Sequence, residues 1–165
     1  MDVQKKVLNR IFGVWLSMAA PIVYIGICEF ILRAGAHGAV FKGYAPLAFP
    51  VYNAVKTTAY LLSALMAAMI VNIKISINEG HVSGLSAIFL KKIEISGGDV
   101  SETVAQSLIV LIAICNSAAV YGITLFFLNG IRGDSYPLMV VAFLLMMLFL
   151  PTKELIDKMA ALKRN

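Results

Sequence analysis

Six polar side chains interrupt otherwise apolar stretches of this chain, and they are its candidates for chemistry: Glu29, Asn53, Lys56, Tyr60, Asn116 and Tyr121. A polar or ionisable group in hydrocarbon is costly unless it faces a partner or water, so such residues mark helix contacts or an ion path. The sequence shows no Ser/His/Asp, Cys/His or paired-carboxylate set, and its two Cys and two His have no metal-ligand spacing. We therefore expect neither an enzyme nor a bound metal or cofactor.

Glu29 and Lys56 are the two charges that lie well inside apolar stretches. If the first stretch crosses a membrane outward and the second returns, the two side chains lie at similar depth and can form an interhelical ion pair. The alternative is that Glu29 pairs with Arg33, one helical turn on, while the Lys56 ammonium extends to the membrane surface. The sequence leaves both alternatives open.

Polar and small residues recur at helical spacing on one face of the second apolar stretch. They are Asn53, Lys56, Thr57, Tyr60 and Ser63, followed by Ala64, Ala67 and Ala68. Small residues let helices approach closely and hydroxyl groups bond across the contact, so this face is predicted to be a helix–helix seam. The alternative is a polar half-channel, which is disfavoured because no acidic residue lies deeper along the strip to receive an ion.

Four apolar stretches would position these side chains, at about 11–32, 46–73, 103–128 and 137–151. A transmembrane helix needs about 20 apolar residues. The apolar fraction is 60% and the charged fraction 14%, against roughly 45–50% and 25% for soluble domains. We therefore predict an all-α integral membrane protein in which residues 1–165 form a single four-helix transmembrane domain. Its two cysteines, Cys28 and Cys115, are expected to be small buried residues.

Lys and Arg are concentrated at the N-terminus, in the second connection and at the C-terminus. The positive-inside rule then places both termini and the second connection in the cytoplasm, which gives an N-in/C-in, multi-pass topology. The membrane would be a bacterial inner membrane or an equivalent energy-converting membrane. The net charge of +5 is thereby assigned to topology and to contact with anionic lipid headgroups, and not to nucleic-acid binding.

Two amphipathic segments lie outside the four apolar stretches. In the second connection, apolar residues between 85 and 90 alternate with serines and precede Lys91 and Lys92. This pattern predicts an interfacial helix, with a cytoplasmic loop that carries a small apolar cluster as the alternative. After Pro151, residues 152–165 interleave charged and apolar side chains, which predicts a bend and an amphipathic cytoplasmic extension. The short connection 129–136, which is rich in Gly and Asp, is expected to form a tight hairpin, and Pro137 is expected in the first turn of the fourth helix.

The third stretch places Asn116 near the middle of the membrane, followed by small residues and then Val120-Tyr121-Gly122. A central amide is expected to join helices, with Ser63 or Tyr60 as its hydrogen-bond partner. The run 116–125 also resembles the outer helix of rotary ATPase proteolipids, the c subunits of the vacuolar and bacterial types. In that family an ion-binding Glu precedes the small residues and the aliphatic-Tyr-Gly step. Here Asn116 stands at the position of the acid, and an amide cannot release a proton.

We expect nearly all of this sequence to lie in the membrane, without a soluble domain that could recognise a substrate. The expected function is a non-catalytic integral membrane subunit of a larger membrane complex, in energy conversion or ion translocation. Its expected partners are membrane lipids and other integral membrane subunits or, by self-association, further copies of this chain. The polar residues inside the apolar stretches support an alternative, a small oligomeric solute or ion transporter. The resemblance implies a third reading, a divergent proteolipid-like rotor component.

Overall fold

The computed structural model describes residues 18–34, 41–80 and 100–162. These residues form helices α2 (Ala20–Ala34), α3 (Phe49–Glu79), α5 (Val100–Asn129), α6 (Arg132–Met147) and α7 (Lys153–Leu162), and they contain no strand. The predicted all-α architecture is therefore confirmed for the described part of the chain. Two of its helices, Phe49–Glu79 and Glu102–Asn129, are long and apolar enough to cross a membrane. The predicted interfacial helix falls within 81–99, outside the described residues.

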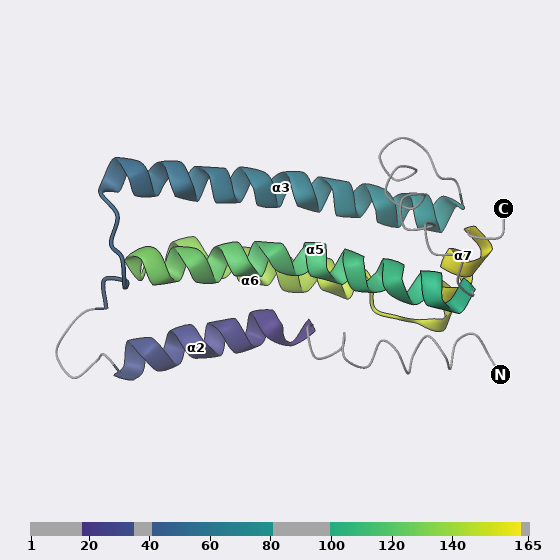
Figure 1. The fold of residues 1–165 in the computed structure, drawn as a ribbon, viewed down its shortest axis with the longest axis horizontal. Coiled ribbons are helices and arrows are strands. Elements are labelled where there is room, and N and C mark those ends of the chain that lie inside the picture. Colours follow the sequence, from purple (N-terminus) through teal and green to yellow (C-terminus); the bar gives the residue numbers. More distant parts are fainter. Residues whose placement is uncertain (1–17, 35–40, 81–99, 163–165) are drawn as a thin grey trace.

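The hairpin of α5 and α6 forms the centre of the fold, with α3 along one side and α2 along another (Figure 1). The short helix α7 packs against α3 and α5 at the far end of the bundle. A buried cluster at this α7 end includes Ile73, Leu108, Phe149 and Met159. Cys115 belongs to this cluster and Cys28 to a second one, and both thiols are free and buried, as predicted.

Local sequence explains where α3 begins and ends. Pro50 lies at the start of the helix, where its missing N–H costs no hydrogen bond. Gly80 ends the helix with a left-handed φ of 69°, and its backbone N–H donates to the Ser76 carbonyl. The helix has 31 residues, which at the rise of an α-helix corresponds to about 46 Å.

The fourth helix differs from the prediction at its start. Helix α6 begins at Arg132, so Pro137 lies inside the helix and not in its first turn. The Pro137 ring removes the donor for the Gly133 carbonyl, but Gly133 is exposed and that carbonyl can meet solvent. At its other end α6 stops at Met147, and the chain passes Pro151 before α7 begins. The chain breaks before Pro151, as predicted, and residues 153–162 of the predicted amphipathic extension form α7, which buries its apolar side against the bundle. The cytoplasmic placement of this extension stays a prediction.

Two close backbone approaches hold the hairpin and its neighbouring loop. A Cβ atom on Gly122 of α5 would lie 2.7 Å from the Ser135 carbonyl oxygen of α6, so glycine permits the two helices to touch. In the loop before α3, Gly43 adopts φ +87°, and a Cβ there would overlap the Leu128 carbonyl. The next residue, Tyr44, donates its backbone N–H to the Phe127 carbonyl at 2.7 Å. The loop is thereby fixed onto the last turn of α5.

Candidate functional site

The first turn of α6 carries a carboxylate that ties this helix to α3. Tyr52 donates its hydroxyl to Asp134 Oδ2 at 2.9 Å, and Lys56 Nζ lies 3.3 Å from Asp134 Oδ1. Tyr60 donates its hydroxyl to the Asp134 backbone carbonyl at 3.0 Å. The three α3 residues follow one another at intervals of four, so they share a face of the helix. We call these four residues the Asp134 cluster.

A second polar contact ties the same turn of α6 to α2. Tyr136 donates its hydroxyl to Glu29 Oε1 at 2.6 Å, and Arg132 Nη1 lies 3.6 Å from the same oxygen. Helix α6 therefore carries a negative charge toward α3 and a positive charge toward α2. The two charges are two residues apart, which places them on different sides of the helix.

The hypothesis of an ion pair between Glu29 and Lys56, one of the two alternatives that the sequence leaves open, is wrong. Each of these residues pairs instead with α6, because both α2 and α3 pack against that helix. The alternative local pair of Glu29 with Arg33 does not form in the described residues either. Sequence reasoning missed Asp134, which it placed in the hairpin before the fourth stretch, although a base and an acid two residues apart beside that stretch, Arg132 and Asp134, were the available signal.

An open groove runs between α3 and α6. It has an upper part at the Asp134 cluster and a lower part that continues along α3 toward Ala67. Its upper part, about 500 Å³, lies beside Lys56, Thr57, Tyr60 and Asp134. Its lower part, about 270 Å³, shares Tyr60 and Ala64 with the upper part. The lower part is otherwise lined by Ser63 and Ala67 of α3 and by Pro137, Leu138 and Val141 of α6. We call the two parts together the α3/α6 groove.

The groove follows the strip of polar and small residues that the sequence predicts as a helix seam. Ser63 is only 3% exposed, and its Oγ atom has no hydrogen-bond partner. A buried hydroxyl is normally paired, and rotation of the Ser63 side chain toward the groove would let its Oγ atom meet a polar group there. The seam is thus joined to α6 by the polar contacts of Lys56 and Tyr60, and the groove lies open beside these contacts and farther along α3, at Ala64 and Ala67.

Asn116 lies on α5 and is half-buried, and its Oδ1 atom is buried without a hydrogen-bond partner. The predicted bond from Asn116 to Ser63 or Tyr60 is therefore wrong for this chain alone. Tyr121 packs at the edge of the buried cluster that contains Tyr52 and Leu125. Asn53 is half-buried on α3, beside the Asp134 cluster in sequence and not part of it.

Within the described ranges, no three His, Cys, Asp or Glu side chains converge to hold a metal ion. Comparison of the chain with protein-family models, with curated proteins and with solved structures found no match. The function is therefore inferred from the chain's own residues.

Proposed function

We propose that the chain is a non-catalytic integral membrane subunit of a larger membrane complex, and that a transmembrane helix of a partner packs into the α3/α6 groove. The observation that carries this proposal is the buried, unpaired Ser63 hydroxyl beside an open groove of small residues. In membranes, helices associate through small residues that permit close approach and through hydrogen bonds between polar side chains. A helix that presents a small or hydroxyl-bearing residue would satisfy both features.

The spacing of charges along α3 supports a membrane crossing. Lys74 follows Lys56 by 18 positions, and the residues between them carry no charge. At the rise of an α-helix this interval measures about 27 Å, close to the roughly 30 Å thickness of the hydrocarbon core. The two lysines would then lie at its opposite boundaries, and Lys56 would be held at one of them by Asp134.

The same spacing recurs in the last part of the chain. No charged residue lies between Asp134 and Lys153. Helix α6 and the segment after it would therefore cross the same layer in the opposite direction, with the Asp134 cluster at one boundary and α7 at the other. The full proposal has four crossing helices with both termini on the cytoplasmic side, in line with the distribution of Lys and Arg.

The lining of the groove favours a helix over an ion as its occupant. The lower part of the groove is lined mainly by Ala64, Ala67 and Val141, with Ser63 and Tyr60 as its polar members. An ion that entered this part would lose water without gaining enough ligands, which is costly in a low-dielectric layer. A half-channel is therefore disfavoured, and so is a transporter that uses this groove. The link to energy conversion or ion translocation remains an expectation from the sequence.

Site-specific photo-crosslinking in the native membrane tests the proposal. A photoreactive residue replaces Ala64, which lines the groove, or, as the matched control, the next residue, Leu65, which is 69% exposed. We expect one discrete product from position 64, larger than this 17.9 kDa chain by the mass of a different protein. Position 65 should react with lipid. Filling the groove with Ala64→Leu and Ala67→Leu should abolish both the product and co-migration on a native gel.

The possible products separate the alternatives. A product of twice the chain's own mass would show that a second copy fills the groove, which would favour an oligomeric transporter over a subunit. Equal labelling from both positions, or none from either, would mean that the groove faces lipid, and the proposal would fail.

A further inference from the structure

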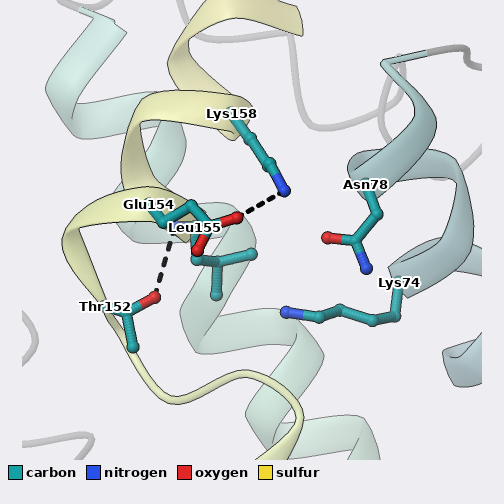
Figure 2. Close-up of a pocket in the computed structure, with 6 residues that line it drawn as sticks. All are labelled: Lys74, Asn78, Thr152, Glu154, Leu155 and Lys158. Atoms are coloured by element: carbon teal, nitrogen blue, oxygen red, sulfur yellow. Dashed lines mark hydrogen bonds and ion pairs between the residues drawn. The ribbon is translucent and has the colours of Figure 1, made fainter.

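A small polar pocket lies at the other end of the bundle, where α7 packs against the last turns of α3 (Figure 2). The pocket has a volume of about 110 Å³. Lys74 and Asn78 of α3 form one wall, and Thr152, Glu154, Leu155 and Lys158 form the other. The pocket is separate from the Asp134 cluster and the α3/α6 groove.

Two lysines extend into the space between these walls. Figure 2 shows the Lys74 side chain reaching from α3 toward Thr152 and the Lys158 side chain reaching from α7 toward Asn78. The Lys74 ammonium lies 5.6 Å from the centre of the Phe149 ring. Within the described part of the chain it has no ion-pair partner. Its positive charge therefore lies beside an aromatic ring, and the Glu154 carboxylate of the opposite wall acts on it through space without a direct ion pair.

The second lysine is only partly neutralised. Lys158 Nζ lies 2.6 Å from Glu154 Oε1, and an ammonium group has three donors. The Glu154 side chain is 77% exposed, so it can turn toward solvent when another anion approaches. The pocket then has two positive groups and a carboxylate that an incoming anion can displace.

The start of α7 adds further donors. Thr152 accepts a hydrogen bond from the Leu155 backbone N–H at 3.3 Å, so its own hydroxyl hydrogen is available to a ligand. The first turn of a helix also presents unpaired backbone N–H groups and a positive dipole end. Lysine ammonium groups, a hydroxyl and a helix start together form the donor set that suits a phosphate.

We propose that this pocket binds a phosphate-bearing anion. Its position favours the headgroup of an anionic phospholipid, because Lys74 lies where the uncharged part of α3 ends. Basic residues at that level attract anionic lipids. The lipid source rests on the proposed membrane crossing, whereas the phosphate chemistry of the pocket does not. A free phosphate compound would use the same donors.

The test uses the full-length chain in mild detergent. Native mass spectrometry measures the retention of phosphatidylglycerol against phosphatidylcholine from an equimolar mixture. In a second arm, the melting temperature is compared in inorganic phosphate and in chloride at equal ionic strength. The variants are Lys74→Gln and Lys158→Gln, with Lys42→Gln as the matched control, because Lys42 is exposed and lies in the loop before α3, next to Gly43, which contacts the last turn of α5.

We expect the wild type to retain phosphatidylglycerol preferentially, and each pocket variant to reduce that preference about fivefold. This factor corresponds to about 1 kcal/mol for each lysine near an anionic surface. Lys42→Gln should have no effect. Stabilisation by inorganic phosphate without a lipid preference would identify a free anion as the ligand and would leave the phosphate chemistry supported.

Two results would overturn the proposal. The first is equal retention of both lipids together with no specific effect of phosphate. The second is a loss of binding in Lys74→Arg as large as in Lys74→Gln when both variants melt like the wild type, since a pocket selected by charge must tolerate arginine. Neither result bears on the α3/α6 groove, so the proposed function stands or falls separately.

Discussion

Replacing Asp134 by Ala should be among the most destabilising single changes at the start of α6. The substitution removes the carboxylate that accepts a hydrogen bond from the Tyr52 hydroxyl. Tyr52 is only 1% exposed, so its hydroxyl would lose this partner in a buried place. A hydrogen bond to a charged acceptor contributes about 1.5–3 kcal/mol. The ion pair with Lys56 adds only about 0.2–1 kcal/mol, since the two side chains are 32% and 22% exposed. The free energy of unfolding should therefore fall by roughly 2–4 kcal/mol.

Asp134→Asn separates the charge from the shape of this side chain. The amide oxygen can still accept a bond from Tyr52, but the charge assistance and the attraction to Lys56 are lost. The expected loss is then about 1–2 kcal/mol. Tyr52→Phe should cost a similar amount, because the Asp134 carboxylate is partly exposed and water can replace the lost donor.

Unfolding of the full chain by sodium dodecyl sulfate in mixed micelles, followed by far-UV circular dichroism, measures these values. Combining Tyr52→Phe with Asp134→Ala completes a double-mutant cycle, for which we expect a coupling energy of about 1–2 kcal/mol. Tyr44→Phe is the matched control: Tyr44 is 71% exposed and should change stability by less than about 0.5 kcal/mol. A double mutant whose loss equals the sum of the two single losses would refute the assigned contact.

Three further predictions address the helix contact, the unpaired amide and the effect of pH. Gly122→Ala should cost about 1–3 kcal/mol, since the new Cβ would lie 2.7 Å from a carbonyl oxygen of α6. In the matched control Gly26→Ala, the new Cβ would have no atom within 4 Å, so this change should be neutral or stabilising by up to about 1 kcal/mol. Equal changes in the free energy of unfolding for the two variants would contradict the close approach of α5 and α6. Asn116→Leu should leave the free energy of unfolding of the isolated chain unchanged or higher, because it removes a buried oxygen without a partner; a clear loss would reveal a partner. The hydrogen bond from Lys158, followed by its charge, lowers the pKa of Glu154 from 4.5. This pair therefore stabilises the fold above pH 4.5, and the gain is lost as the pH falls through the folded-state pKa. Melting curves of Glu154→Gln should lack this acid-side slope, and an unchanged slope would contradict the assignment.

Features that depend on local sequence could be predicted for this chain. Long apolar stretches produce helices, and a proline followed by interleaved charged and apolar residues produces the break at Pro151 and the amphipathic helix α7. The buried state of Cys28 and Cys115 follows from their apolar neighbours. Each of these inferences needs only the residues within one or two helical turns.

The partners of the charged residues could not be predicted in the same way. Glu29 and Lys56 lie at comparable depth, but the helix that both of them contact is α6, and no local pattern reveals which helices are neighbours. Asp134 was assigned to a turn because Pro137 was expected in the first turn of the helix, whereas α6 begins at Arg132. An error of about one helical turn at a boundary thus concealed the acid that organises the site.

The polar side chains at the two ends of this bundle and those along its length find their hydrogen-bond partners in different ways. At one end Asp134 and Glu29 bind hydroxyl and cationic groups of neighbouring helices, and at the other Glu154 binds Lys158. Between these ends, Ser63 Oγ and Asn116 Oδ1 are buried and unpaired. Along α5, the hydroxyls of Ser107, Ser117 and Thr124 donate to the backbone carbonyl four residues back, whereas Ser63 and Asn116 make no such bond. In the proposed hydrocarbon layer, their partner would come from another polypeptide or a trapped water. In the proposed membrane arrangement, these two unpaired atoms support the proposal that a helix of a partner packs against the bundle.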